Sequence, residues 1–270
     1  MNRTVIRLAV LVCLAAGLAP SAARAQFATT NVQLLHGWGF EDAVLGYTTS
    51  NEQMTTLTVN HFSTWKYGDN FAFVDLYRGD FDRADQAYLE SNLYAEWHPR
   101  LFVNRLLGMK GNVLGIFKDF GLAAEVNQGY GFYAYLAGVG GDLALPIPGV
   151  VGINLFYRYD SVQLPPAAGN DIRNNTWQVS PYWTVPFSIG PVPVLFTGFV
   201  DVSGTNDNED VDVMAQPQLL VDVLGATGGA KGKVLAGVEW YLHYNPNEEA
   251  MGAPSDLVSA PQVMVQWNLH

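Results

Sequence analysis

From about Gln86 to the C-terminus, the chain is a series of segments roughly ten residues long in which apolar and polar positions alternate. A period of two predicts a strand with one apolar and one polar face. No helical segment is left to cover so many apolar faces. A closed barrel in a membrane resolves this, because lipid covers the outer face and water fills the lumen. The clearest segment alternates Val234, Ala236, Val238, Trp240, Leu242 and Tyr244 with more polar residues.

The pattern predicts an all-β fold, a transmembrane antiparallel β-barrel of twelve strands, which is an even number as in bacterial barrels. Short turns rich in Gly or Pro alternate with longer polar loops, as periplasmic turns alternate with extracellular loops. The segment 98–117 breaks the pattern and is interpreted as a periplasmic excursion or a short helix under the barrel, with an extra strand as the alternative. The predicted strands are 32–40, 54–65, 70–78, 86–97, 118–127, 132–145, 150–160, 175–186, 192–203, 212–223, 232–244 and 260–270.

The N-terminal residues have the features of a secretory signal peptide. Arg3 and Arg7 precede a short apolar core, and Ala23-Arg24-Ala25 has the form of a cleavage site. The apolar run is too short for the alternative, a membrane-spanning anchor. We therefore expect a signal peptide over 1–25 and an outer-membrane β-barrel over 26–270.

The composition excludes several functions. The only cysteine, Cys13, lies inside the signal, so no disulfide or thiol chemistry is expected in the mature chain. Without the three arginines of the signal, 11 basic residues remain against 25 acidic ones, a net charge of −14. This balance argues against nucleic acid as a partner. The five histidines stand in no zinc-like spacing with carboxylates, and neither a metal nor a cofactor is expected.

The polar parity of the strands predicts an unusual lumen, in which aromatic rings alternate with carboxylates and amides. A ring can stack on a heteroaromatic base, which contributes roughly 1–3 kcal/mol per base. Carboxylates and amides can bond to sugar hydroxyls and exocyclic amines. Because a barrel of this size has a narrow lumen, the combination favours single-file passage of an uncharged polar ring compound. The alternative is that the rings only brace the wall.

Candidate substrate-binding residues follow from this parity. Rings of one strand are predicted to face rings of the next across a slot for a flat base, with acids and amides beside them for ribose hydroxyls. A basic and acidic pair closes the far wall, and three further residues extend the path. The set is Phe71, Phe73, Asp75, Tyr77, Tyr88, Glu90, Asn92, Tyr94, Glu96, Arg158, Asp160, Glu239, Tyr241 and His243.

Several stretches resemble the nucleoside-specific outer-membrane channels, the Tsx-like family. They are Glu96-Trp97-His98-Pro99-Arg100-Leu101, Leu107-Gly108, Gly115-Ile116-Phe117-Lys118-Asp119-Phe120, Gly138 to Pro146, and Asn154-Leu155-Phe156-Tyr157-Arg158-Tyr159. The resemblance covers mainly 70–160. It implies a twelve-stranded monomeric porin of the Gram-negative outer membrane that contacts its lipid, is inserted by the barrel-assembly machinery, and passes nucleosides.

The chain departs from this family at both ends. The Trp- and His-rich opening of the family is reduced to His36-Gly37-Trp38-Gly39, and the last residue is His270 where such barrels end in Phe. The alternation of Val263, Val265, Trp267 and Leu269 is retained. These departures bear on the substrate more than on the fold.

Two other functions compete with a channel. His61 and Ser63 share one strand face, as in barrel lipases and deacylases, so a lipid-modifying barrel enzyme is one alternative. A non-transporting barrel for adhesion or envelope structure is the other. The glycines of 138–141 lie within a strand, which favours close strand packing or a bend and not a dinucleotide loop. We expect no enzymatic activity.

Overall fold

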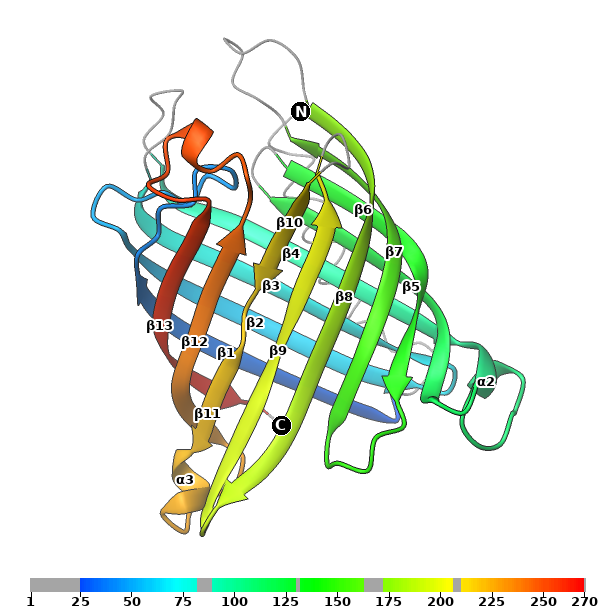
Figure 1. Ribbon diagram of the computed structural model, residues 1–270. Coiled ribbons are helices and arrows are strands. Elements are labelled where there is room, and N and C mark those ends of the chain that lie inside the picture. Colours follow the sequence, from blue (N-terminus) through cyan, green and yellow to red (C-terminus); the bar gives the residue numbers. More distant parts are fainter. Residues whose placement is uncertain (1–24, 82–88, 130–131, 163–171, 206–209, 270) are drawn as a thin grey trace.

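The computed structural model describes residues 25–81, 89–129, 132–162, 172–205 and 210–269. In this part of the chain, thirteen strands form one antiparallel sheet (Figure 1). The sheet closes on itself, because the last strand pairs with both the first strand and its own predecessor. The predicted signal peptide lies outside the described residues except for Ala25, as does His270.

The elements follow one another around the barrel in chain order. They are β1 (Phe27–Trp38), β2 (Gln53–Trp65), β3 (Gly68–Phe81), β4 (Leu89–Phe102), α2 (Val103–Leu106), β5 (Phe117–Gly129), β6 (Phe132–Leu143), β7 (Val150–Val162), β8 (Ile172–Ile189), β9 (Val192–Gly204), β10 (Val211–Ala215), β11 (Gln218–Asp222), α3 (Val223–Ala226), β12 (Val234–Tyr244), the 3-10 helix η2 (Glu249–Met251) and β13 (Leu257–Asn268).

Strands β10 and β11 are two parts of one interrupted strand of the barrel wall, since both lie between β9 and β12. The break falls at Gln216 and Pro217, and proline has no N–H to donate to a sheet ladder. The two residues still take part in backbone bonding, because Gln216 donates to the Phe199 carbonyl and Trp240 donates to the Pro217 carbonyl. With β10 and β11 counted as one, the described strands form a barrel wall of twelve strands, and the predicted all-β barrel is confirmed.

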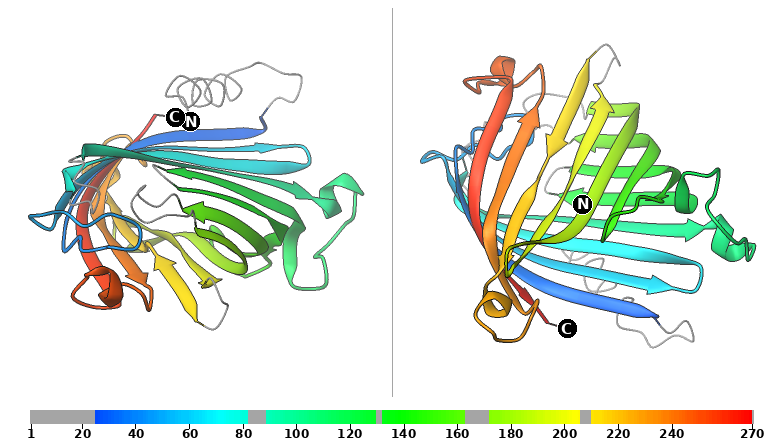
Figure 2. Two further views of the ribbon diagram at one scale, coloured as in Figure 1. Left: turned by 90° about the horizontal axis from the view of Figure 1, so that it is seen from above. Right: turned by 60° about the horizontal axis from the view of Figure 1, so that its bottom comes forward.

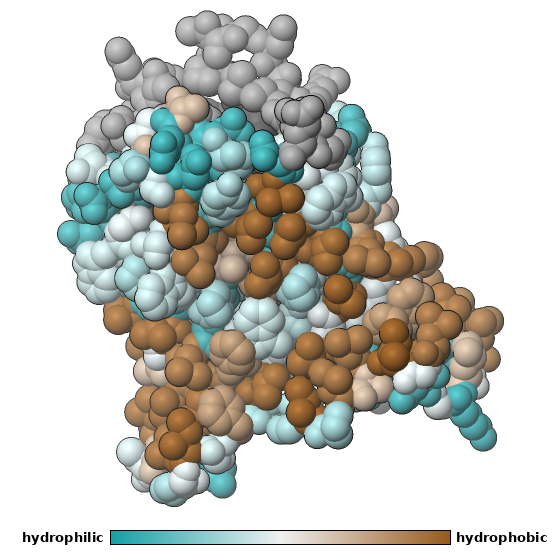
Figure 3. Space-filling view, viewed as in Figure 1, coloured by the Kyte–Doolittle hydropathy of each residue, from teal (hydrophilic) through white to brown (hydrophobic). Residues whose placement is uncertain are grey.

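The alternation read from the sequence is realised as an outer and an inner face. Along β13, Val263, Val265 and Trp267 are about half exposed, whereas Met264 and Gln266 between them are buried. Apolar side chains of this kind form the broad band across the barrel wall in Figure 3, below a more polar rim at the end with the long loops. A continuous apolar outer face is what a lipid bilayer covers, so the fold is a transmembrane barrel.

Aromatic side chains lie on the outer face of several strands. Tyr135, Trp177, Trp240 and Trp267 are all exposed. Such rings suit the membrane–water boundary, because they have an apolar body and a polar edge. Within the residues described above, no helix is long and apolar enough to cross a membrane.

The segment 98–117 shows where the sequence-based boundary was wrong. Strand β4 continues through Pro99 to Phe102, with Pro99 opposite Asn70 of β3. The missing N–H of the proline is harmless, because the pairing of β4 with β5 lapses between Trp97 and Arg100. The rest of the segment contains the short helix α2, as one of the two interpretations expected, and no additional strand is described in it.

Glycines let β6 approach its neighbours closely. A Cβ atom at Gly138 would lie 1.9 Å from the Leu155 carbonyl oxygen of β7, and one at Gly141 would lie 2.1 Å from that of Asp119 in β5. Both contacts are with backbone, which cannot move aside without breaking the ladder. The predicted role of these glycines in close strand packing is therefore confirmed.

We expect Gly138→Val to lower the free energy of unfolding by about 3 kcal/mol, because the added atoms overlap the β7 backbone. The measurement is urea unfolding of the barrel refolded in lipid vesicles. Ala137→Val is the matched control, since Ala137 is the next residue of β6 and its side chain is exposed on the outer face. Equal stability of the two variants would contradict the assigned strand approach.

Figure 2 shows the barrel along its opening and from its lower end. The loop between β1 and β2 (residues 39–52) and the loop between β12 and β13 (residues 245–256) lie at the same end of the barrel, and α2 and α3 lie at the other (Figures 1 and 2). We refer to these as the loop end and the turn end.

Candidate functional site

The candidate site is the inner face of the barrel. The predicted inward parity holds for the described members of the set: Asp75, Tyr77, Asp160, Glu239, Tyr241 and His243 are buried, and Phe71, Phe73, Asn92, Tyr94, Glu96 and Arg158 are partly buried. Tyr88 lies outside the described residues, and the side chain of Glu90 does as well. Alternation alone therefore identified which side chains point inward.

Four rings and one imidazole form a continuous row on the inner face of β3, β4 and β6. Ring centroids are 5.9 Å apart for Phe71 and Phe73, 5.6 Å for Phe71 and His98, 6.0 Å for Phe73 and Tyr94, and 6.4 Å for Tyr94 and Phe132. Phe73 and Tyr94 come from neighbouring strands and meet diagonally, as cross-strand side chains do. They pack on each other at a tilt of 53° and do not stand apart as a ready-made slot.

Hydrogen-bonding groups run beside this row. Asp75 accepts from Thr58 at 2.5 Å and from the Tyr77 hydroxyl at 2.9 Å. The Tyr94 hydroxyl donates to Glu96 at 2.5 Å. Carboxylates held by hydroxyl groups in this way can exchange those partners for the hydroxyls of a solute, because the donor chemistry is the same. Asn92, in contrast, uses its side-chain oxygen locally, accepting from the Leu93 N–H.

His98 lies between two acids of the same face. Its Nε2 is 2.6 Å from Glu96, and its Nδ1 is 3.3 Å from Glu125 of β5. The three ligand atoms lie within 4.8 Å of one another, so this group could hold a metal ion. Glu125 is also bonded to the amide of Asn127 at 2.8 Å, which fixes its orientation.

The predicted far wall is connected to the ring row. Arg158 of β7 donates to Asp160 at 2.8 Å and to the side-chain oxygen of Gln178 in β8. Its guanidinium lies 5.9 Å from the centre of the Phe132 ring, and Phe132 contacts Tyr94. Arg158 and Tyr94 are thus linked through a residue that the sequence interpretation did not select.

Glu239 is separate from that row. It accepts from Gln218 of β11 at 2.6 Å and from Gln262 of β13 at 2.7 Å. Two amide donors satisfy the carboxylate, and each comes from a strand next to β12. Glu239 therefore ties β11, β12 and β13 together, and it remains on the inner face.

At the turn end, one arginine joins three inner-face groups. Arg100 of β4 binds Asp69 of β3 through two nitrogens, at 2.8 and 2.5 Å, and lies 3.0 Å from Asp142 of β6. It also donates to the hydroxyl of Tyr182 in β8, which itself donates to Asp142 at 2.6 Å. Because β4 and β8 are four strands apart in the sheet order, this cluster crosses the lumen.

At the loop end, residues 39–52 enter the barrel mouth. Phe40 is fully buried against Tyr241, with ring centroids 5.6 Å apart. Tyr47 contacts Tyr77 of β3 at 4.9 Å and Tyr241 of β12 at 6.5 Å. The loop therefore places an aromatic side chain between β3 and β12, which are four strands apart around the wall, and this narrows the mouth.

The loop is held by a polar network around His243. The imidazole lies 2.8 Å from Asp42 of the loop through Nδ1 and 2.9 Å from Asp212 of β10 through Nε2. Burial tends to raise the pKa of Asp42, but the imidazole and the hydroxyl of Tyr241 hold it below its ordinary value. The pKa of Glu248, which also faces His243, is raised by burial. Tyr241 and His243 thus anchor the loop in addition to lining the predicted path.

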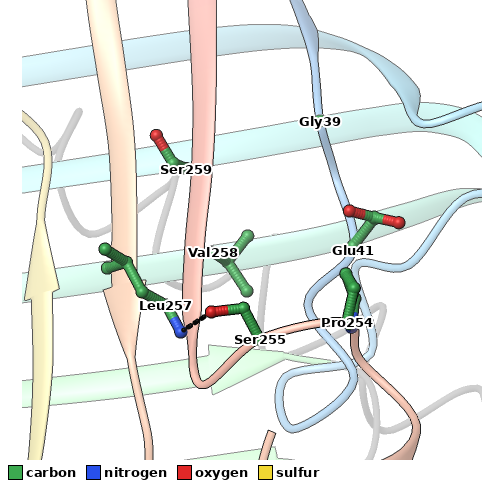
Figure 4. Close-up of a pocket in the computed structure, with 7 residues that line it drawn as sticks. All are labelled: Gly39, Glu41, Pro254, Ser255, Leu257, Val258 and Ser259. Carbon is green, nitrogen blue, oxygen red and sulfur yellow. Dashed lines mark hydrogen bonds between the residues drawn. The ribbon is translucent and has the colours of Figure 1, made fainter. Parts of the chain in front are cut away.

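A small pocket of about 210 Å³ lies beside this network, between the loop end of β1 and the start of β13 (Figure 4). Its lining includes Gly39, Glu41, Pro254 and Ser259, and Ser255 accepts the N–H of Leu257 at 3.1 Å. The pocket lies at the rim formed by these loops and is separate from the ring row.

Several inner-face residues escaped the sequence interpretation. Glu125 and Phe132 lie on predicted strands, and their parity was the available signal. His98 and Arg100 were placed in a connection because the strand was ended before Pro99. Asp42, Tyr47 and Glu248 lie in loops, where alternation carries no information about direction.

The pair considered for lipid chemistry is His61 and Ser63 of β2. The described hydrogen bond of His61 joins its Nδ1 to the hydroxyl of Thr30, at 2.9 Å. Nucleophilic catalysis needs the base to contact the nucleophile, and the bond described for His61 is with Thr30 and not with Ser63. An enzymatic role stays an alternative.

Comparison with family models gives no match, and comparison with curated protein sequences gives none. Solved structures with similar folds include a NanC porin, with 11% identity and a TM-score of 0.49 over 88% of this chain and 98% of that one. A bacterial polysaccharide outer membrane secretin has 12% identity and a TM-score of 0.39, over 88% and 97%. The translocator domain of the autotransporter NalP from Neisseria meningitidis has 11% identity and a TM-score of 0.32, over 98% and 95%.

These neighbours are, by their descriptions, a porin, an outer membrane secretin and an autotransporter translocator domain, and at such low identity the likeness is one of fold. It extends over most of each chain, but the TM-scores are below 0.5 and carry no functional information. Function is argued below from the side chains of this chain alone.

Proposed function

We propose that this protein is an outer-membrane channel of a Gram-negative bacterium that lets nucleosides diffuse inward. The observation that carries the proposal is the ring row of Phe71, Phe73 and Tyr94, flanked on the same inner face by Asp75 and Glu96. Rings bind the flat base by stacking, and carboxylates accept hydroxyl groups of the ribose. The resemblance of 70–160 to the nucleoside-specific channels points to the same solutes.

The charges of the inner face suit a neutral solute. Glu96, Glu125, Asp201 and Glu239 lie on the lumen side, and Arg158 is already paired with Asp160. A nucleotide would bring a phosphate beside these carboxyl groups, which supply no counter-charge for it. A nucleoside has the same base and sugar without that charge. We therefore propose that nucleosides pass and nucleotides do not.

The test is conductance of the purified barrel in planar bilayers, with adenosine and adenosine monophosphate added on either side. Adenosine is expected to reduce the ion current in a saturable way, because a stacked base occupies the path. The nucleotide is expected to have little effect. Liposome swelling with nucleosides, sugars and amino acids measures passage directly. Ion current that adenosine never alters would contradict the proposal.

A second candidate is a barrel that transports nothing and serves envelope structure or adhesion. It is favoured by the burial of inner-face side chains, since Gln178 is 1% exposed and Glu125 is 3% exposed. Side chains that satisfy one another can fill a lumen and brace its wall. The absence of any unit conductance from correctly folded protein would favour this candidate over a channel.

The remaining proposals concern the cellular context. The exposed apolar face supports contact with outer-membrane lipid, and insertion of such a barrel implies the barrel-assembly machinery as a transient partner. We propose a monomer, as the family resemblance implies. Removal of residues 1–25 as a signal peptide stays a prediction, which N-terminal sequencing of the mature protein would check.

A further inference from the structure

A buried group of one imidazole and two carboxylates lies at the loop end. Asp42 comes from the loop after β1, His243 from β12, and Glu248 from the loop after β12. Each of the three is 0% exposed. His243 Nδ1 lies 2.8 Å from Asp42 Oδ2 and 3.2 Å from Glu248 Oε1, and the ligand atoms all lie within 4.8 Å of one another.

Other groups hold the three side chains so that one atom of each converges. Asp42 accepts the Leu45 N–H with its other oxygen, Oδ1, at 2.7 Å. Glu248 accepts the Ala43 N–H with its other oxygen, Oε2, at 2.8 Å. Each carboxylate therefore has one oxygen fixed by backbone and one directed at the imidazole, and that oxygen of Asp42 also accepts the Tyr241 hydroxyl.

The far nitrogen of the imidazole has a partner of its own. His243 Nε2 lies 2.9 Å from Asp212, which also accepts the side-chain amide of Asn245 at 2.7 Å. When a metal ion binds, the proton can stay on Nε2 beside Asp212, and the lone pair of Nδ1 is then directed at Asp42 and Glu248. Histidines that ligate metals are commonly oriented by a carboxylate in this way.

An independent observation points to a ligand at this cluster. Glu248 Oε1 is fully buried and accepts no hydrogen bond, although its neighbours are polar. Leaving a buried carboxylate oxygen unsatisfied is costly, and a single Nδ1 can donate to only one of two carboxylates. A cation at the convergence of the three atoms would satisfy all of them.

We propose that Asp42, His243 and Glu248 bind one divalent metal ion of the zinc type. Imidazole nitrogen with carboxylate oxygen is a zinc ligand set, whereas calcium and magnesium prefer oxygen ligands alone. Three protein ligands leave a fourth position for water or a solute. The ion would tie loop 39–52 to β12 and hold Tyr47 in the barrel mouth. The site does not depend on nucleoside passage.

The test is a titration of the folded, chelator-treated barrel in detergent with zinc chloride, against a competing chromophoric chelator. One Zn²⁺ per chain is expected. Glu248→Gln and Asp42→Asn should abolish stoichiometric binding, and Asp212→Asn should weaken it about 10–100-fold, as expected for a group that orients a ligand. Heat-dependent migration in detergent gels confirms that each variant is a folded barrel.

Glu125→Gln is the matched control, because Glu125 belongs to the other His-carboxylate group, around His98, in which every carboxylate oxygen already has a partner. It should leave zinc binding unchanged. The proposal is overturned if the folded wild-type chain binds no zinc, which would mean that His243 simply pairs with the acids. It is also overturned if Glu248→Gln and Asp42→Asn both bind as the wild type does, or if Glu125→Gln alone abolishes binding. If Glu248→Gln fails to fold, the graded loss in Asp212→Asn decides.

Discussion

Replacing Arg100 by Met is expected to lower the free energy of unfolding by about 3–5 kcal/mol, because two buried carboxylates lose their common counter-charge. Arg100 binds Asp69 through two nitrogens and also contacts Asp142, and all three side chains have little exposure. Methionine keeps the length of the side chain but supplies no donor. Urea unfolding of the barrel refolded in vesicles measures the change.

Arg105 provides the matched control at the same end of the barrel. It binds Asp119 at 2.6 Å, but its side chain is 30% exposed, and Asp119 keeps a hydrogen bond from Asn104. Water screens such a pair, so Arg105→Met is expected to cost about 1 kcal/mol or less. Adding Asp69→Asn to Arg100→Met should recover part of the loss. Equal losses of unfolding free energy in the two arginine variants would show that the Arg100 cluster contributes no more to stability than the exposed Arg105–Asp119 pair.

Phe73→Ala is expected to weaken the block of ion current by adenosine by about 1–3 kcal/mol, the contribution of one lost stack. In the blocking constant this is a change of about 5- to 150-fold. Tyr94→Ala should act similarly, since the two rings are in contact. The current without nucleoside should persist or rise, because a ring leaves the lumen while the pairing of β3 with β4 stays intact.

Two controls separate stacking from other effects. Tyr135→Ala removes a ring of similar size from the outer face, where Tyr135 is 51% exposed, and should leave the block unchanged. Tyr94→Phe removes only the hydroxyl that donates to Glu96 and keeps the ring. If neither Phe73→Ala nor Tyr94→Ala alters the block while both lower the ion current equally, the rings only brace the wall.

Together these experiments test three groups of residues on the inner face with three different measurements. The ring row is tested by nucleoside block, the turn-end cluster by stability, and the loop-end network by metal binding. Each readout follows a different residue, because the described contacts of Phe73, Arg100 and Glu248 are with different partners. If adenosine blocks the current normally but the chain binds no zinc, the proposed channel function stands and only the proposed metal site is lost.

The sequence alone determined the class of fold and the direction of most strand side chains. Alternation of Val263, Val265 and Trp267 with buried partners follows from the pleat, which turns successive side chains to opposite faces. The same rule placed Asp75, Tyr77 and Glu239 inside. Counting the alternating segments predicted the number of strands, because each strand of a closed membrane barrel turns one apolar face to lipid.

Local signals were weaker at the ends of strands. A strand was predicted to end at Trp97 because 98–117 breaks the alternation, but β4 continues through Pro99, whose missing N–H lies beside a lapse in pairing. Whether a proline is tolerated depends on its neighbour strand, which is a matter of register and not of composition. Pro217 likewise interrupts one strand of the wall, which is divided into β10 and β11, while both parts keep their pairing with β9 and β12.

Only the tertiary structure decided which side chains meet. Phe73 and Tyr94 pack together because the register of β3 and β4 sets them diagonally, and this closed the slot that parity had suggested. Asp42 and His243 are 201 residues apart in sequence, and they come together because β12, β13 and β1 adjoin where the barrel closes. Alternation specifies a face at each position, whereas contacts across the lumen require the curvature, closure and register of the whole sheet.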